Sequence, residues 1–412
     1  MTYRTMLTEY FAAAIAAASP RHVLPAALPR GLVKGKTLVL AYGKAAAEMA
    51  LVAAQTLEGP VTGLAVTRHG HGADLSHTKI ELIEARHPVP DDYSLQAGTK
   101  MLELAATAGP DDRVVFLASG GGSALLCAPA KGITLVEKQA ITDALVRSGA
   151  PIQDINLVRR HLSRVKGGRL AAIAGARGAE LHTFVISDVA GDDPSLVASG
   201  SSIASPFDPK GALSVLQGAG IDVPEHIHAA IMANRSAIAI EHPVHTVATN
   251  GDALRAIERL ALADGWQVID SGKALTGDAA TCGKAHAIQA QIYARTPGRY
   301  LMISGGELTV SKARKDGQGG PNLEYLVGLM SALPRHAKIE ALAGDTDGID
   351  GTQDNAGGYL QASCVQQSDA LHALATNNTY PFVQRLGGLI MTGPTRTNVN
   401  DVRLIAIEGA ST

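Results

Sequence analysis

Short runs of β-branched and other apolar residues alternate along this chain with alanine- and leucine-rich stretches of helical length. The apolar runs end in Gly, Ser, Asp or Asn, residues that terminate strands and begin turns. This alternation predicts parallel sheets with covering helices. Because ligands of open parallel sheets bind beyond the carboxyl ends of the strands, the turns there define the expected active face. The clearest strand candidates are Thr37–Ala41, Arg113–Ala118, His182–Ile186, His245–Ala248, Arg299–Ile303 and Glu340–Ala343.

The pattern also indicates how the chain divides into domains. Its 412 residues exceed what one hydrophobic core usually organises. The alternation loosens between Asp222 and His242, where Pro224 and Pro243 bracket a helix-like stretch. We therefore predict two α/β domains, one over residues 1–235 and one over residues 240–412, with the largest polar cleft between them.

Composition narrows the class of protein. A formal net charge of −2 gives no reason to expect nucleic acid or an acidic membrane as the main partner. The apolar run at 11–18 reads as part of an opening helix over residues 3–18, because acidic Glu9 beside it argues against a signal peptide. No window approaches the roughly 20 apolar residues of a membrane span. Three widely spaced cysteines, Cys127, Cys282 and Cys364, suit a reducing cytoplasm, and a homo-oligomer is compatible with the sequence.

One glycine-rich turn is the strongest chemical signal. A predicted strand runs into Ser119, Gly120, Gly121, Gly122 and Ser123, and a helical stretch follows. Backbone N–H groups at such a turn, together with a helix N-terminus, would bind the phosphates of a nucleotide. A tight strand-to-helix turn without a ligand fits the same residues. The stretch matches neither GxxxxGK[ST] nor GxGxxG, so a Walker-type loop and a nicotinamide fingerprint are both unsupported.

A related segment lies in the second half, where Ser304, Gly305, Gly306 and Glu307 follow a predicted strand. Two such turns would suit a ligand with two ends, so we expect Gly305, Gly306 and Glu307 to contact nucleotide or phosphate. Asn322 can cap the helix after GQGGP and is a further nucleotide candidate. Glu307 and Glu324 have two interpretations each. They could orient a metal or a ribose, or they could be an ordinary surface carboxylate and a helix-cap carboxylate.

Lysines and arginines supply candidates for charge neutralisation. Lys44 follows a glycine at a strand-to-helix turn, where its ammonium could meet a carboxylate or a transferring phosphoryl group. A solvated first-turn lysine is the alternative. In NLVRRHLSRVKGGRLA we expect Arg160 and Lys166 to bind substrate anions, although a basic face exposed to water fits equally well.

Aspartates follow two of the predicted strands. Asp188, Asp192 and Asp193 occur in VISDVAGDDP, and Asp345, Asp347 and Asp350 in ALAGDTDGIDG. Hard carboxylate oxygens there suit Mg²⁺ or general-base catalysis, and about half of the six should prove structural. Asp188 and Asp347 are the preferred catalytic and metal candidates. His69, His71 and His87 lack the ligand spacing that zinc requires.

Taken in order, these segments resemble the glycerate kinases whose C-terminal portion is called the MOFRL domain. The similarity spans nearly the whole chain. It implies a Rossmann-like first domain and ATP-dependent conversion of D-glycerate into 2-phosphoglycerate with a divalent cation, here taken as Mg²⁺. Lys44 matches a lysine of the family motif, and the resemblance implies that it contacts the substrate or the transferred phosphoryl group. The matching segments are GKAAAEMA, RHPVPDDYSLQAG, LASGGGSALLCAP, NLVRRHLSRVKGGRLA, ISDVAGDDPSLVASG, SGGELTV, GGPNLE, GDTDGIDG and GPTRTNVND.

One departure from the family pattern concerns charge. Many relatives carry arginine in GRGGRNQE, whereas this chain has Gln318 and Pro321 in GQGGPNLE. Some proteins of this type are labelled hydroxypyruvate reductases, so NAD(P)H-dependent reduction is the alternative activity. A further alternative is not an enzyme: a protein that binds a sugar acid in the same cleft without converting it. The density of charged groups beside phosphate-like turns favours catalysis.

Overall fold

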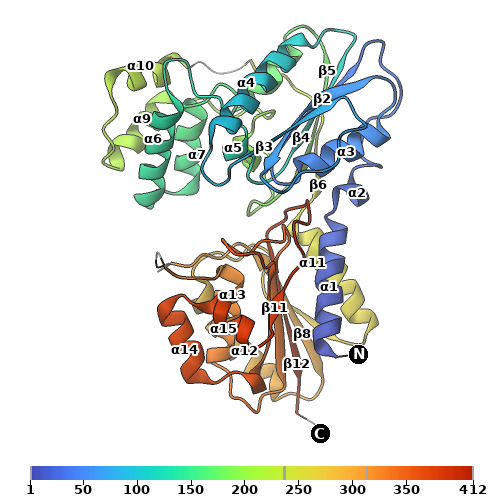
Figure 1. Cartoon of the computed structure of the whole chain (residues 1–412), viewed down its shortest axis with the longest axis vertical. Coiled ribbons are helices and arrows are strands. Elements are labelled where there is room, and N and C mark those ends of the chain that lie inside the picture. The colour runs from blue at the N-terminus through green and yellow to red at the C-terminus, as the bar shows by residue number, and fades with distance from the viewer. Residues whose placement is uncertain (1, 235–237, 312–313, 315, 411–412) are drawn as a thin grey trace. The chain divides into compact units, whose positions relative to one another are not determined.

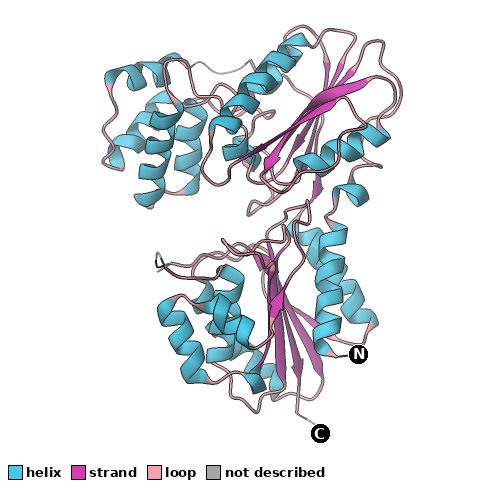
Figure 2. Ribbon diagram, viewed as in Figure 1, coloured by secondary structure: helices cyan, strands magenta, loops and turns pink. Residues whose placement is uncertain are grey.

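The computed structural model describes residues 2–234, 238–311, 314 and 316–410, and Figures 1 and 2 show its helices and strands. The chain splits into two compact units. The parallel-sheet unit runs from Val23 to Val247, and the mixed-sheet unit combines Met1–His22 with Ala248–Thr412. The expected first domain, 1–235, therefore includes 22 residues that belong with the other unit, and its expected end at 235 lies outside the described residues. Both units contain helices and strands, which confirms the α/β class.

The parallel-sheet unit contains a six-stranded sheet in the order β3-β2-β1-β4-β5-β6. This is the strand order of a Rossmann fold. Neighbouring strands from β3 to β5 pair in parallel, as the sequence predicts. The strands are β1 (Thr37–Tyr42), β2 (Val61–Arg68), β3 (Ile80–Ala85), β4 (Arg113–Ala118), β5 (Glu180–Ile186) and β6 (Val244–Ala248). The helical segments are α3 (Ala46–Thr56), α4 (Asp92–Thr107), α5 (Gly122–Leu125), α6 (Leu135–Arg147), α7 (Ile152–His161), α8 (Arg169–Gly175), η1 (Val197–Ser199), α9 (Pro209–Gly218) and α10 (Glu225–Ala233), and the short helix α2 (Pro20–Val23) ends where this unit begins.

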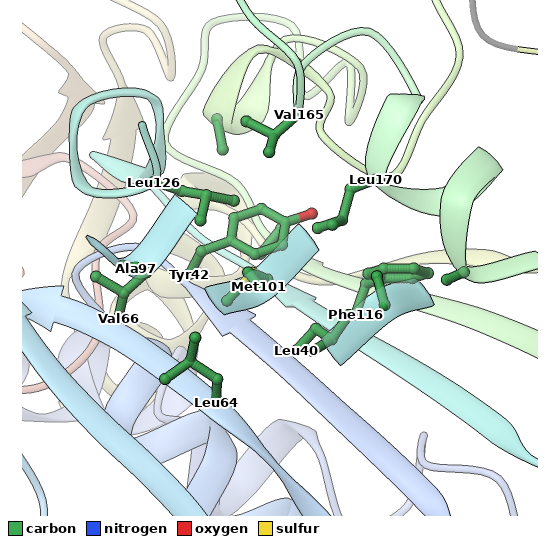
Figure 3. Packing of buried hydrophobic residues seen from close by; sticks show 14 of the residues in the cluster. Leu40, Tyr42, Leu64, Val66, Ala97, Met101, Phe116, Leu126, Val165 and Leu170 are labelled. Atoms are coloured by element: carbon green, nitrogen blue, oxygen red, sulfur yellow. The ribbon is translucent and has the colours of Figure 1, made fainter. Parts of the chain in front are cut away.

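The central strands of this sheet are buried on both faces. Every residue of β1 and of β4 is buried, which is the expected pattern for a parallel sheet covered by helices. Figure 3 shows Tyr42, at the end of β1, among Met101, Leu126 and Val165. The Tyr42 hydroxyl lies 3.1 Å from Ser202 Oγ, so its polar group is satisfied in the core. The end of β1, where the candidate site begins, is thus rigidly packed.

A second core in this unit joins helices α6, α7, α9 and α10. These helices lie to one side of the sheet in Figure 1. Leu145, Val158 and Ile231 are fully buried among them. This helical group holds α7, whose last turn carries Arg159, Arg160 and His161.

The mixed-sheet unit contains a sheet in the order β11-β10-β9-β12-β8-β7. Only the β7–β8 pair is parallel, and the expected parallel sheet is therefore wrong for this half. The helix α13 connects β8 to β9, and β12 inserts antiparallel between them, which makes a split β-α-β unit. The segments are α1 (Tyr3–Ala17), α11 (Asn250–Ala263), β7 (Gln267–Asp270), α12 (Ala279–Ala294), β8 (Arg299–Gly306), α13 (Pro321–Ser331), β9 (Ile339–Asp345), β10 (Gly357–Gln361), η2 (Ala362–Cys364), α14 (Gln367–Thr376), α15 (Thr379–Arg385), β11 (Leu389–Ile390) and β12 (Asp401–Glu408).

The opening helix α1 explains why the N-terminus belongs to the mixed-sheet unit. Thr2 caps it by accepting a hydrogen bond from Thr5 N. Leu7, Phe11 and Ala14, spaced three and four residues apart, form a buried stripe. The helix packs on α11, β9 and β12, and the Phe11 ring lies where a side chain at Gly344 would otherwise stand. The predicted helix over residues 3–18 is confirmed, and no helix among the described residues is long and apolar enough to cross a membrane.

Candidate functional site

Two strand-to-helix turns interlock at the carboxyl ends of β1 and β4. Ser119 N donates to Tyr42 O at 3.0 Å, Lys44 N donates to Gly120 O at 2.8 Å, and Ala45 N donates to Ser119 Oγ at 3.0 Å. A Cβ atom at Gly43, which has φ 124°, would stand 2.4 Å from Ser119 O. Only glycine fits this close approach, so the two turns fix one another.

Lys44 and His87 lie against the glycine turn. A Cβ atom at Gly121 would meet the His87 ring at 3.1 Å and Lys44 Cγ at 3.2 Å. The N–H groups of Gly120 and Gly121 have no hydrogen-bond acceptor within the described part of the chain. Backbone donors beside a lysine stem are the elements of an anion-binding turn. The geometry therefore supports a ligand at Ser119–Ser123, whereas a purely structural turn would leave these donors unexplained.

The helix that follows this turn is shorter than the sequence suggests. The helix α5 has only four residues, Gly122–Leu125, so little helix dipole is available to an anion. A buried segment from η1 supports the turn instead. Ser123 Oγ lies 2.8 Å from Ser199 Oγ, and Ser199 Oγ lies 3.3 Å from Asn156 Oδ1.

The supporting segment has a strained backbone. Ala198, Ser199 and Gly200 have φ values of 52°, 57° and 64°, and the left-handed region is costly for the first two. Ala198 also packs where a side chain at Gly122 would stand. Backbone strain of this kind persists only where the surrounding structure enforces it, and it concentrates at functional sites. Sequence reasoning missed Ser199, and the Ser-Gly-Ser-Ser run at 199–202 is the signal that could have found it.

Lys166 supports the turn from inside the protein. It is fully buried, and its Nζ donates to Ser123 O at 2.9 Å. Burial, reinforced by the nearby Lys138 ammonium, lowers the pKa of Lys166 well below its usual range. We expected a direct contact between Lys166 and a substrate anion, but this burial gives the lysine a role in positioning the turn.

The aspartates after β5 have different environments. Asp188 is half-buried, two residues beyond the strand. Asp192 and Asp193 are exposed, and Asp193 accepts a hydrogen bond from Ser195 N at 2.9 Å, a turn role. No group of three or more His, Cys, Asp or Glu side chains among the described residues is arranged to hold a metal ion.

In the mixed-sheet unit, the expected turn at Ser304–Glu307 is mostly strand. Ser304, Gly305 and Gly306 are the last residues of β8 and pair with β12. Gly305 N donates to Gly272 O at 2.8 Å, so this N–H is already satisfied. A Cβ atom at Gly305 would stand 1.7 Å from Asn250 Oδ1. Close packing thus accounts for this glycine, and only exposed Glu307 extends beyond the strand.

A buried network lies behind this strand end. Arg403, fully buried, donates to Gly305 O at 3.0 Å and forms an ion pair with Asp401. Asn322 Nδ2 donates to Asp401 Oδ1 at 2.7 Å. The side-chain oxygen of Asn322, Oδ1, is buried and has no hydrogen-bond partner in the described ranges. Asn322 therefore retains one acceptor for a ligand or water.

The cap of α13 comes from a distant residue. Asp350 accepts from Asn322 N at 3.0 Å and from Leu323 N at 3.1 Å, so the expected cap by Asn322 is wrong. Burial raises the pKa of Asp350 to about 7, and the backbone N–H of Asn322 opposes this rise. Pro321 is the first residue of α13, where its fixed φ is favourable and it contributes no charge.

Asp347 is buried in the loop after β9. Its carboxylate accepts from Ile349 N at 2.8 Å, and its own N–H donates to Asp345 Oδ1 at 2.9 Å. Glu324 is also buried and accepts from Asn377 Nδ2 at 3.1 Å. Burial raises the pKa of Glu324. These contacts give both carboxylates fixed positions.

The structure assigns the candidate residues to two separate groups. Lys44, the Ser119–Ser123 turn, Lys166 and Asp188 belong to the parallel-sheet unit, whereas Glu307, Asn322 and Asp347 belong to the mixed-sheet unit. Arg160 lies in a small pocket on the helical side of the parallel-sheet unit, together with His161 and Arg169. This pocket does not include Lys44 or the glycine turn.

A Rossmann-type sheet with a glycine turn, followed by a mixed-sheet unit built on a split β-α-β motif, defines a two-unit α/β protein. Residues 6–232 match the model of a domain of unknown function (DUF4147), and residues 300–401 match that of the MOFRL family. The chain belongs to the family of proteins that combine these two domains.

Named relatives cover nearly all of the chain. A protein of Agrobacterium vitis named "Putative hydroxypyruvate reductase" is 40% identical over 98% of this chain and 94% of its own length. The glycerate 2-kinase of Pyrococcus horikoshii is 37% identical over 91% of this chain and 88% of its own. The crystal structure of glycerate kinase from Thermotoga maritima matches with a TM-score of 0.86 and 31% identity, covering 98% of this chain and 99% of that one.

Proposed function

We propose that this protein transfers the γ-phosphoryl group of ATP to the 2-hydroxyl of D-glycerate, giving 2-phosphoglycerate and ADP. The observation that carries the proposal is the turn after β4, where the N–H groups of Gly120 and Gly121 have no acceptor among the described residues and the Lys44 stem lies beside Gly121. The relatives named glycerate 2-kinase and glycerate kinase support the same reaction.

Lys44 is the proposed electrostatic catalyst. Phosphoryl transfer spreads negative charge over the equatorial oxygens of the transferred group, and a fixed ammonium stabilises that charge. The same ammonium could bind the carboxylate of glycerate. Interlocking of the β1 and β4 turns holds the Lys44 backbone, because Lys44 N donates to Gly120 O at 2.8 Å. The Ser119–Ser123 turn supplies the backbone donors, and Lys166 holds this turn through Ser123 O.

Asp188 and Asp347 are the proposed metal ligands and proton acceptors. Mg²⁺ in kinases is usually bound by one or two carboxylates plus substrate phosphates, and Asp188 and Asp347 are the carboxylates proposed for this role. When bound, Mg²⁺ would neutralise charge on the ATP phosphates. The proton leaves the 2-hydroxyl as its oxygen bonds to phosphorus, and one of these carboxylates would accept it. Asn322 Oδ1 and exposed Glu307 remain candidates for nucleotide contacts.

The name of the Agrobacterium relative makes hydroxypyruvate reduction the competing function. A dinucleotide-binding Rossmann unit carries GxGxxG in its first strand-to-helix turn, with the pyrophosphate at the helix N-terminus. The equivalent positions here are Gly43, Ala45 and Glu48, and Glu48 is buried in the first turn of α3. The third glycine of that fingerprint permits close helix–strand packing, and the Glu48 side chain occupies its position here. The structure of this turn therefore favours the kinase.

Two parallel assays test the proposal. Incubation with ATP, Mg²⁺ and D-glycerate should release ADP in proportion to glycerate consumed. Hydroxypyruvate with NADH or NADPH should show no oxidation above background. Nicotinamide oxidation without ADP release would assign the reductase, and glycerate binding without either reaction would assign the sugar-acid binding protein.

A further inference from the structure

A histidine to which the proposed reaction assigns no role lies against the glycine turn. His87 lies two residues beyond the end of β3. A Cβ atom at Gly121 would stand 3.1 Å from His87 Cδ2 and 3.2 Å from His87 Nε2. The edge of the ring that faces Gly121 is therefore the edge that carries Nε2. A ring nitrogen donates or accepts a hydrogen bond according to the tautomer of the histidine.

The glycine turn is packed at one residue and accessible at the next. At Gly122, which is buried, a Cβ atom would stand 2.7 Å from Ala198 Cβ. Gly121, Lys44 and His87, in contrast, each retain partial exposure. Solvent therefore contacts all three residues, and a ligand can meet them without entering a sealed cavity.

Hydrogen-bond donors and positive charge gather around Gly121. The N–H groups of Gly120 and Gly121 have no acceptor in the part of the chain that the structure describes. Lys44 Cγ lies 3.2 Å from the same Cβ position of Gly121 that the His87 ring approaches, and the ammonium is at the end of that lysine side chain. Backbone N–H groups, histidine and lysine are donors that proteins use to bind oxyanions. An anion that accepts from Gly121 N–H would therefore lie close to both side chains.

The chain is anchored on both sides of His87. Before it, Ala85 O accepts a hydrogen bond from His69 N at 3.0 Å. After it, Pro90 O accepts from Gln139 Nε2 at 2.6 Å. The segment that carries His87 thus has a fixed path, and a group held in place before binding loses less conformational freedom when it contacts a ligand.

We propose that His87 Nε2–H donates a hydrogen bond to an oxygen of the anionic group bound at the Ser119–Ser123 turn, beside the Lys44 ammonium. This inference rests on the proposed function, since ATP and D-glycerate are the anions considered. A phosphate of ATP and the carboxylate of glycerate share the oxyanion chemistry that these donors recognise. His87 is then a substrate-contacting residue. Its hydrogen stays on Nε2, and the proton of the 2-hydroxyl goes to a carboxylate.

Variants of His87 separate a donor role from simple packing. H87L removes the donor, whereas H87Q offers an amide N–H near the position of Nε2. We expect H87L to lower kcat/KM for glycerate phosphorylation about tenfold or more, because a hydrogen bond to a charged group is lost, and H87Q to recover most of this loss. H77L makes the same change at an exposed histidine before the amino end of β3, and should have near-normal kinetics. Equal losses in H87L and H87Q would make His87 a packing residue and overturn the proposal.

Nitrogen-15 NMR of the wild-type protein, labelled at its histidine rings, tests the contact without turnover. The His87 signals are identified by their absence from H87Q. Separate titrations with D-glycerate and with Mg²⁺ plus the non-hydrolysable ATP analogue AMP-PNP distinguish the two sources of the anion. We expect one of these ligands to shift the signals of Nε2 and its hydrogen, while the His77 signals stay in place.

The two proposals can fail separately. A shift of the His87 Nε2 signal in a protein that releases no ADP from ATP and D-glycerate would refute the proposed reaction and support the His87 contact. ADP release, with a His87 Nε2 signal that neither ligand moves, would support the reaction and overturn the contact.

Discussion

Two segments of this chain share the sequence Ser-Gly-Gly, yet one forms a turn after a strand and the other forms the end of a strand. At Ser119–Gly121 the chain leaves β4, and the N–H groups of Gly120 and Gly121 remain without an acceptor among the described residues. At Ser304–Gly306 the same residues stay within β8, paired with β12.

The neighbours of each segment explain the difference. The turn after β4 is held by another turn, through the hydrogen bonds that Lys44 N and Ala45 N donate to it. The end of β8 has a strand partner, and Arg403 donates to the Gly305 and Gly306 carbonyl oxygens. A glycine-rich motif therefore indicates that another group approaches the backbone closely. Whether this group is a ligand or another part of the protein depends on the surrounding structure.

The comparison predicts the largest functional effect at Lys44. Lys44→Met retains much of the apolar stem and removes the charge. We expect kcat/KM for glycerate phosphorylation to fall about 100-fold or more, equivalent to roughly 2.7 kcal/mol, with unchanged melting behaviour. Lys34→Met, an exposed lysine just before β1, should have near-normal kinetics. Near-normal constants for Lys44→Met would remove this lysine from the mechanism.

Replacement of the strand glycine should act on stability. In Gly305→Ala the new methyl group would stand 1.7 Å from Asn250 Oδ1. Asn250 cannot yield easily, because its Nδ2 donates to Val399 O and Asp401 O. We expect a loss of about 2–3 kcal/mol in the free energy of unfolding, measured by urea denaturation. Gly218→Ala, where nothing lies within 4 Å, serves as the control. An unaltered unfolding midpoint for Gly305→Ala would contradict the packing explanation.

Replacement of the turn glycine should act on both stability and activity. Gly121 has φ 77°, so Gly121→Ala incurs backbone strain of about 1–2 kcal/mol. Its methyl group would also press on the His87 ring and the Lys44 stem, and we expect about a tenfold lower kcat/KM. Gly132→Ala has a similar φ of 88° and no neighbours within 4 Å. Equal kinetic losses in the two variants would show that strain alone is responsible.

The smallest expected effect is the loss of stability between pH 6 and pH 8 that arises from Asp350. Its pKa, raised by burial to about 7, exceeds that of an unfolded aspartate. The folded state therefore holds a proton that the unfolded state releases, and stability falls as pH rises from about 4 to about 7. Between pH 6 and 8 this contributes about 1 kcal/mol. Asp350→Asn should remove this slope in urea titrations, whereas exposed Asp369→Asn should preserve it.

Much of the fold could be predicted from local pattern. Thr37–Ala41 and Arg113–Ala118 coincide with β1 and β4 because both strands are continuous buried apolar runs that end in polar or glycine residues. The opening helix was predictable from its apolar spacing. The glycine turn after β4 and the lysine after β1 were visible for the same local reason.

Other features depend on contacts that local pattern does not contain. The insertion of β12 between β8 and β9 turns an expected parallel sheet into a mixed one. The packing of Phe11 at Gly344 joins the N-terminus to the mixed-sheet unit. Lys166 looks like a solvent-facing cation in sequence, but tertiary packing buries its ammonium against Ser123 O. Similarly, the cap on α13 comes from Asp350, 28 residues after Asn322.

Phosphorus-31 NMR of the wild-type protein with ATP, Mg²⁺ and D-glycerate is the most direct test of the proposed reaction. It follows the transferred group itself, and the position of the new phosphoester is read from its coupling to carbon-bound hydrogen. A phosphoester at C2 that grows as the γ-phosphorus signal of ATP declines is the predicted result. Persistent ATP, or a phosphoester at C3, would contradict phosphorylation of the 2-hydroxyl.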